Sequence, residues 1–354
     1  MSVAELQIHH LRSITQLKLS FHPLFNIIYG PNGSGKTSLL EAIYLLSAGY
    51  SFKTRETLPL VQYNSPHLTV FARTFMDESI SLRKTISGPT QVKLNAQPCQ
   101  NSSVLARYLP SLVFYQDIFQ IIDAGPSVRR SLLDWGVFHV KHEYHSLWSD
   151  YRQVLKQRNT LLRKKANKKE IIPWDQQLVS LAKGLDKLRQ AYFETWEQVF
   201  QHYLSQLSNI QCSITYYRGW RTRHDEDLAD VLEEQYFSDC QRQYTQSGAH
   251  QADIRIETTN ATARQGLSRG QQKMILIALK LAQGHLLEKE CIYLFDDLTS
   301  ELDDGHIGRL LNCLKTIKGQ KIITVLDPKI LDCCFSDDEV KYYNLEHSVE
   351  QTLA

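Results

Sequence analysis

The chain lacks any apolar run that approaches the ~20 residues needed for a membrane-spanning helix, so we expect no membrane partner. Its first residues, MSVAELQIHHLRS, lack the apolar core and the cleavage site of a secretory signal. The seven cysteines are odd in number, scattered and without a C-x-x-C pair, which disfavours both a disulfide framework and a zinc site. We therefore expect a cytoplasmic protein with reduced thiols.

The sequence also lacks a strong charge bias. Its 40 Lys and Arg residues and 38 Asp and Glu residues give a formal net charge of +2. A strongly basic domain would have indicated nucleic acid, whereas this balance neither requires nor excludes it. Repeats at solenoid spacing and low-complexity segments are absent too. A length of 354 residues with 42% apolar residues indicates a globular protein of two domains or one elaborated domain.

The apolar pattern predicts an α/β head that is built from both ends of the chain. Short alternating runs near the N-terminus predict antiparallel strands, and Phe25–Tyr29 predicts a buried strand before a helix at Thr37–Leu46. In the last third, ADIRIE, CIYLFDD and KIITVL predict strands that alternate with helices at Arg269–Leu286 and His306–Ile317. Strands and helices that alternate at this spacing favour a parallel sheet.

The middle of the chain predicts a helical insertion. Apolar residues recur every three or four positions over Ser127–Leu162 and Trp174–Leu207, and the polar stretch RKKANKKE between them predicts a hairpin. Each helix would be at most ~54 Å long at 1.5 Å per residue, which makes a short arm and not a long coiled coil. The predicted domains are a discontinuous head of residues 1–125 and 245–354 and an inserted arm of residues 126–244.

The segment GPNGSGKT fits the phosphate-loop pattern G-x-x-x-x-G-K-[ST] between a predicted strand and a predicted helix. Glycines let successive amides point at phosphate oxygens, and a helix N-terminus attracts anions. Lys36 should reach the β- and γ-phosphates, and the Thr37 hydroxyl should bind Mg²⁺. A chance match is disfavoured by the order of strand, loop and helix. The predicted ATP-binding residues are Gly30, Pro31, Asn32, Gly33, Ser34, Gly35, Lys36, Thr37 and Ser38.

Two acids end the predicted strand CIYLFDD and would complete a magnesium and hydrolysis site. Phosphate-loop proteins hold Mg²⁺ with an acid at the end of a buried strand. We predict that Asp296 serves the metal together with Thr37, and that Asp297 is the catalytic residue that polarises the attacking water. Two aspartates that merely begin a loop are common in isolation, but the phosphate loop in the same chain weakens that alternative.

The segment LSRGQQK predicts a helix start with Ser268 as its N-cap and Gly270 in its first turn. Taken alone, this is an ordinary helix start. It precedes the Asp296 strand, however, and adds a second anion site to a chain that already has one. We therefore expect a nucleotide to be held between two chains.

The order GPNGSGKTS, LSRGQQK, YLFDD and SELD resembles the Walker A, signature, Walker B and D-loop motifs of ABC and SMC ATPase heads. The tracts GPSVRRSLLDWGVFH, LKQRNTLLR and GAHQAD narrow this to a resemblance to the RecF family, which covers nearly the whole chain. The implied fold is α/β: an ABC-type P-loop ATPase head with an antiparallel β lobe and an inserted helical second domain.

The resemblance also implies a function. The RecF family implies an ATP-dependent homodimer that binds DNA at single-strand gaps and works with RecO and RecR to load RecA during repair, recombination and replication. It implies that Ser268 and Gly270 contact the γ-phosphate held by the other subunit, and that Asp296 is the metal site.

The sequence departs from the general ABC pattern at two places. Asp297 stands where transporters have the longer glutamate, so we expect slow hydrolysis. The resemblance to the RecF family implies that DNA stimulates it. Leu326 and Asp327 follow the strand KIITV where many ABC heads have a histidine, so the γ-phosphate sensor is not assigned. Gln116 is interpreted as a solvated loop residue, not as a magnesium contact.

The DNA contacts are predicted on weaker signals. Arg129 and Arg130 would serve DNA or a dimer interface equally well, and Lys164 and Lys165 belong to a charge run that is usually just a solvated turn. His250 and Asp253 have no metal partner at ligand spacing, so GAHQAD is interpreted as structural or interfacial.

Two other functions compete with DNA repair. The ATPase subunit of a transporter is disfavoured by the helical insertion, the antiparallel N-terminal strands and Asp297. An SMC-like chromosome-structural protein needs a far longer coiled coil than the predicted arm.

Overall fold

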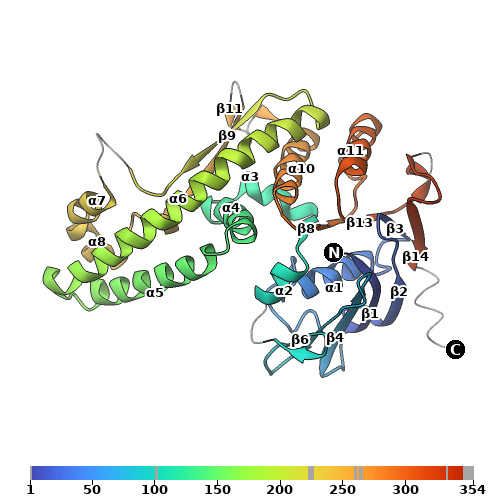
Figure 1. The fold of residues 1–354 in the computed structure, drawn as a ribbon, viewed down its shortest axis with the longest axis horizontal. Coiled ribbons are helices and arrows are strands. Elements are labelled where there is room, and N and C mark those ends of the chain that lie inside the picture. Colours follow the sequence, from blue (N-terminus) through green and yellow to red (C-terminus); the bar gives the residue numbers. More distant parts are fainter. Residues whose placement is uncertain are drawn as a thin grey trace. The chain divides into compact units, whose positions relative to one another are not determined.

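The computed structural model describes residues 2–99, 103–221, 227–258, 261–262, 266–331 and 334–345. The chain forms two compact units, one of Met1–Ile118 with Leu287–Ala354 and one of Phe119–Leu286 (Figure 1). The head built from both ends of the chain thus matches the first unit in outline. The predicted boundary differs, because residues 245–286 lie in the second unit, where their strand and helix find their partners.

The first unit contains an antiparallel sheet of strand order β2-β1-β4-β5-β6-β7. Alternate side chains of its long strands are buried, as expected for a sheet with one face on the core. Arg12, with φ 51°, makes the tight turn between the first two strands. The strands are β1 Val3–Leu11, β2 Ile14–Ser20, β4 His67–Thr74, β5 Ser79–Thr85, β6 Gln91–Leu94 and β7 Gln97–Pro98.

A parallel sheet of strand order β14-β3-β13-β12-β8 lies in this unit and confirms the predicted parallel sheet for CIYLFDD and KIITVL. The prediction was wrong for ADIRIE, because Asp253–Thr258 pairs antiparallel with Cys212–Tyr217 in a separate sheet. The inner strands of the parallel sheet are continuous buried runs, as expected for strands covered on both faces. Parallel pairing brings the ends of β3, β12 and β13 to one edge, which places the candidate site. The strands are β3 Phe25–Tyr29, β8 Ser111–Phe114, β12 Ile292–Phe295, β13 Lys321–Val325 and β14 Val340–Asn344.

Helix α1, Lys36–Ala48, follows β3 and contacts strands of both sheets. Nearly every residue from Ser38 to Ser47 is therefore buried, and its leucines belong to the main apolar core of the unit. This packing fixes the start of the helix, and with it the phosphate loop. The unit also contains α2 Ser103–Tyr108, η1 Gln116–Phe119 at its boundary, α11 Asp304–Thr316 and η3 Pro328–Ile330.

The second unit is mainly helical, with an antiparallel sheet of order β11-β10-β9. Helices α5 and α6 pack along each other, and α10 packs on α6, where Trp196 Nε1 donates to Leu279 O at 3.0 Å. The elements are α3 Gln120–Asp123, α4 Pro126–Val140, α5 Tyr144–Arg163, α6 Lys168–Leu207, β9 Cys212–Tyr217, α7 Leu228–Glu234, α8 Tyr236–Arg242, η2 Ala249–Gln251, β10 Asp253–Thr258, β11 Ala261–Thr262 and α10 Arg269–His285.

The predicted arm helices need two corrections. The first predicted helix is in fact α4 and α5, because Lys141 is extended and ends α4. The second starts earlier than predicted, at Lys168, where Asn167 and Glu170 form a capping box, and it contains Pro173. Its 40 residues span about 60 Å, more than the predicted maximum.

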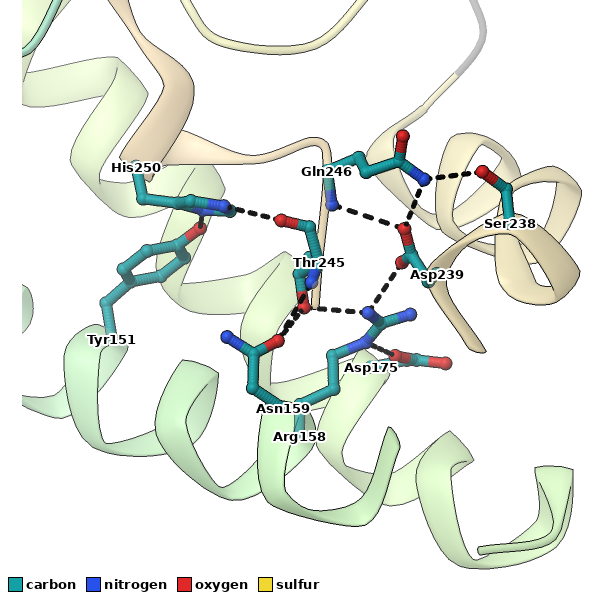
Figure 2. Close-up of polar contacts among 9 residues, drawn as sticks. All are labelled: Tyr151, Arg158, Asn159, Asp175, Ser238, Asp239, Thr245, Gln246 and His250. Atoms are coloured by element: carbon teal, nitrogen blue, oxygen red, sulfur yellow. Dashed lines mark hydrogen bonds and ion pairs between the residues drawn. The ribbon is translucent and has the colours of Figure 1, made fainter. Parts of the chain in front are cut away.

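A buried polar network ties together α5, α6, α8 and the segment before η2 (Figure 2). The fully buried Arg158 lies 2.5 Å from Asp175 Oδ1 and 2.7 Å from Asp239 Oδ2, and it donates to Thr245 Oγ1 at 2.8 Å. His250 Nδ1 lies 2.7 Å from Tyr151 Oη, and its Nε2 lies 3.0 Å from Thr245 O (Figure 2).

The sequence predicts neither a membrane-spanning helix nor a disulfide framework. Within the described ranges, every helix is too short or too polar to cross a bilayer. The described cysteines are free thiols, of which three are buried and three are partly exposed: Cys212, Cys291 and Cys313, and Cys99, Cys240 and Cys334.

Candidate active site

The phosphate-loop segment takes the backbone conformation that its glycines permit. Gly30, Gly33 and Gly35 have φ of 147°, 86° and 95°, a region that side chains disfavour. A Cβ on Gly33 would contact nothing within 4 Å, so the backbone angle alone requires glycine there. Gly35 is the N-cap of α1 and provides no side-chain cap, which leaves the first amides of the helix for an anion.

The Ser34 hydroxyl provides a test of whether a phosphate fits this loop. Its Oγ is buried and has no hydrogen-bond partner among the described residues, while the Ser34 amide donates to Pro31 O at 3.3 Å. A buried hydroxyl without a partner is unfavourable by about 1–3 kcal/mol. A phosphate oxygen in the loop would accept that hydrogen bond, so the segment fits the predicted ligand.

The Lys36 ammonium lies across the loop. Its Nζ donates to Gly30 O at 2.6 Å and to Pro31 O at 2.9 Å. Burial lowers the pKa of Lys36, and the charges of Asp297 and Asp296 oppose this effect. The lysine is therefore electrostatically coupled to both acids, as expected for one site.

Thr37 and Asp296 meet although 259 positions separate them in the sequence. Thr37 Oγ1 donates to Oδ1 and Oδ2 of Asp296 at 3.0 and 3.1 Å. Burial raises the pKa of Asp296, and the hydrogen bond from Thr37 opposes that shift. A hydroxyl beside one carboxylate matches the few protein oxygens that Mg²⁺ uses when phosphates complete its shell. Within the described residues, no cluster of three or more His, Cys, Asp and Glu side chains could hold a metal.

Asp297 has a left-handed backbone, with φ 52°, directly after Asp296. Such a conformation costs a non-glycine residue roughly 1–2 kcal/mol and is found at functional sites where the surroundings enforce it. Its N–H donates to Thr324 Oγ1 at 2.8 Å, and its side chain is half-buried. The turn therefore holds the two acids in different conformations.

Thr324 is a site residue that the sequence did not reveal. It lies on β13, the strand beside β12, and its Oγ1 donates to Asp296 Oδ1 at 3.2 Å. The motif positions alone give no signal for it, because its importance depends on the neighbouring strand. The sequence predicts the strand KIITV, but the ABC pattern points only to the positions after Val325.

A second unpredicted contact joins the β1–β2 turn to helix α1, which begins at the end of the phosphate loop. Arg12, in the β1–β2 turn, donates from Nη2 to Glu41 Oε1 at 2.7 Å, and Ser51 Oγ donates to the same oxygen at 2.5 Å. Glu41 is fully buried on α1. The turn is thereby fixed to the helix, and its Ile14 Cγ1 would lie 3.4 Å from a Cβ on Gly35.

Ser268 is the N-cap of α10, as predicted, in the second unit. Its Oγ accepts the Gln271 amide at 3.3 Å, and Gln271 Oε1 accepts the Ser268 amide at 3.0 Å. Gly270 lies in the first turn of the helix. The predicted helix cap is present, and the contact of this helix start with a phosphate held by a second subunit stays a prediction.

The predicted DNA-binding arginines make internal contacts. Arg129 forms a bidentate ion pair with Asp253, at 2.8 and 2.9 Å, and its third nitrogen donates to Ala124 O at 2.9 Å. Arg130 donates to Ala252 O at 2.7 Å. All three nitrogens of Arg129 are thus engaged within the unit, so its role in the fold is clear and its DNA contact stays a prediction.

The other weak candidates lie where the sequence suggested. Lys164 and Lys165 are exposed at the end of the α5–α6 hairpin. Gln116 is exposed at the start of η1, and Asp327 caps η3 by accepting the Lys329 amide at 3.0 Å. His250 and Asp253 have internal partners, which supports the structural interpretation of GAHQAD.

Comparison with known proteins shows the family to which this chain belongs. Residues 2–350 match the family model for the RecF/RecN/SMC N terminal domain. "DNA replication and repair protein RecF" of Pseudomonas paraeruginosa is 36% identical and aligned over 99% of this chain and 98% of its own. The protein with the same name from a Shewanella species is 38% identical over 93% of each.

Solved structures give the same result. The recombination mediator protein RecF-ATP in the RecFOR pathway is similar with a TM-score of 0.82 and 26% identity over 92% of each chain. An Smc head bound to the C-winged helix domain of ScpA is similar at a TM-score of 0.58 and 18% identity over 94% of this chain and 91% of its own, which supports the shared fold alone.

Proposed function

Because this chain belongs to the RecF family of DNA replication and repair proteins, we propose that it is an ATPase that acts in DNA repair. The observation that carries the proposal is the meeting of Thr37 and Asp296, at 3.0 Å, beside a phosphate loop with the required backbone angles. ATP would bind at residues 30–38, as the solved RecF-ATP complex of a relative also supports.

The chemistry follows from the residues at the sheet edge. Mg²⁺ held by Thr37 and Asp296 would neutralise charge on the phosphate oxygens. Lys36 would bind the β- and γ-phosphates, and Asp297 would orient the attacking water. Because the side chain of Asp297 is one methylene shorter than that of glutamate, hydrolysis would be slow. Membership of a family of DNA replication and repair proteins supports the further proposal that DNA stimulates it.

ATP would also join two copies of the chain. Ser268 and Gly270 lie at the N-terminus of α10, where the helix dipole attracts anions, and we assign to them the γ-phosphate bound by the partner subunit. The homodimer would bind DNA at gaps between single- and double-stranded regions, largely through phosphate contacts that salt weakens. RecO and RecR would be its partners in loading RecA, as the pathway named for its solved relatives supports.

The decisive experiment is Lys36→Ala. Removing the ammonium of the loop should weaken ATP binding and reduce turnover by at least about a hundredfold, since electrostatic stabilisation is most of phosphoryl-transfer catalysis. ATP binding and phosphate release are measured on the full chain, with the exposed Lys93→Ala as the matched control. A folded Lys36→Ala protein with wild-type turnover would overturn the assignment of the loop.

A further inference from the structure

We propose that Thr324 is a positioning residue for ATP hydrolysis, and that its hydroxyl holds both site acids in place. This inference rests on the proposed function of the site. The hydroxyl accepts the Asp297 N–H at 2.8 Å and donates to Asp296 Oδ1 at 3.2 Å. One oxygen thus links the carboxylate of the metal-site acid to the backbone of the catalytic acid.

The linkage closes a small ring across the Asp296–Asp297 peptide. Thr324 also uses its backbone, because its carbonyl accepts the Leu298 amide at 3.1 Å. The turn after β12 is therefore attached to β13 at successive amides. This attachment fixes the left-handed backbone of Asp297.

The residue type suits this task. Thr324 is fully buried, and a β-branched side chain has a restricted χ1 angle in a strand, so its hydroxyl direction is fixed. Its donor and one acceptor site are both used. Thr37 also donates to Asp296, but it is half-buried and is itself assigned to the metal and the phosphates. Of the two hydroxyls that donate to Asp296, only that of Thr324 has no proposed contact with the metal or the phosphates, so we assign it to positioning.

A substitution can separate the hydroxyl from the shape of the side chain. Thr324→Val leaves the Asp297 amide without its acceptor and removes one of the two hydrogen bonds to Asp296 Oδ1, whereas Thr324→Ser keeps the hydroxyl. Groups that orient a metal ligand typically contribute 10–100-fold to metal affinity or activity. We expect Thr324→Val to raise the Mg²⁺ concentration for half-maximal turnover, and to lower kcat, by about tenfold each.

The experiment uses the full chain and three readouts: the thermal midpoint, ATP binding with and without Mg²⁺, and turnover across a Mg²⁺ series. ATP binding in EDTA should change by less than about twofold in Thr324→Val, because the phosphate loop is untouched, and Thr324→Ser should restore most of the Mg²⁺ response. Thr74→Val is the matched control, since Thr74 is also buried and its hydroxyl also accepts backbone amides, of Met76 and Glu78, in a turn of the antiparallel sheet.

A folded Thr324→Val protein with wild-type Mg²⁺ dependence and kcat would overturn the inference, and so would a Thr324→Ser protein as impaired as Thr324→Val. If Thr324→Val does not fold, Thr324→Cys replaces it, because a thiol is only a weak donor and acceptor. Wild-type behaviour of Thr324→Cys would then count against the role. These outcomes leave the proposed function intact as long as Lys36→Ala is inactive, whereas a wild-type chain that does not hydrolyse ATP would overturn the function itself.

Discussion

Asp296 and Asp297 are neighbours in sequence, but their surroundings give them separate tasks. Asp296 accepts hydrogen bonds from Thr37 and Thr324, and burial raises its pKa. Asp297 has a left-handed backbone, and its charge acts on Lys36. Sequence motifs predicted both acids and the whole phosphate loop, because these depend on residues close together in the chain. They did not predict Thr324, which becomes a neighbour only when β13 pairs with β12.

Changing each acid to asparagine should impair a different step of the ATP cycle. Asp297→Asn should bind ATP and dimerise but hydrolyse at least about a hundredfold more slowly, because the carboxylate that polarises water is lost. Asp296→Asn should weaken Mg²⁺-dependent ATP binding about tenfold or more and prevent the dimer. Turnover, ATP binding and the dimer lifetime after ATP is diluted out are the measurements.

Asp77→Asn is the matched control for these variants, because Asp77 is an exposed turn residue of the same unit with a left-handed backbone, at φ 60°. Its activity should equal that of the wild type. An Asp297→Asn protein with unchanged turnover and dimer lifetime would show that another group holds the water.

At the scale of elements, the apolar periodicity predicted which segments are helices or strands better than it predicted where each helix or strand begins and ends. The strands of the antiparallel sheet alternate clearly, and all of the predicted ones from β1 to β6 are present. Apolar spacing continues across the break between α4 and α5 and therefore predicts one helix there, and the polar stretch RKKANKKE predicts a hairpin although its last residues begin α6. The capping box of Asn167 and Glu170 marks the start of α6, and the helix continues through Pro173, which has no amide to donate within it.

The network around Arg158 should be an important polar support of the second unit (Figure 2). Arg158→Ala should lower the free energy of unfolding by about 3–5 kcal/mol, because it leaves the fully buried Asp239 without its cation. Urea unfolding of the full chain, followed by signals from its tryptophans, measures the loss. Arg163→Ala, an exposed arginine on the same helix, should change stability by less than about 0.5 kcal/mol. Equal stabilities for both variants would contradict this role.

At the scale of the molecule, the sequence predicted that both chain ends meet in one unit, because the motifs of one ATP site lie near both ends. It did not assign residues 245–286 to the second unit, since strand and helix types say nothing about which partner they choose. The signature helix α10 therefore belongs to a different unit from the phosphate loop of its own chain. We predict that this helix contacts the nucleotide bound by the other subunit of a dimer.

Ser268→Arg tests the two-subunit site. A bulky cation at this N-cap should leave ATP binding by the single chain within about twofold of wild type, and it should prevent ATP-dependent dimerisation. Sedimentation with and without ATP gives both the mass and the bound nucleotide. Ser247→Arg is not a fair comparison because Ser247 is buried, so the exposed Ser205→Arg serves as control. Loss of ATP binding by monomeric Ser268→Arg would mean that the motif acts within its own chain.

The strand order β14-β3-β13 has a consequence for biosynthesis. The strand that leads into the phosphate loop, Phe25–Tyr29, is made early, but both of its hydrogen-bonding neighbours are made near the end, at Lys321–Val325 and Val340–Asn344. At ribosomal speeds of about 5–20 residues per second, β3 waits roughly a quarter of a minute to a minute without partners. A nascent chain therefore has no complete nucleotide site, and the apolar strand β3 is exposed to chaperones and to aggregation until translation is nearly finished.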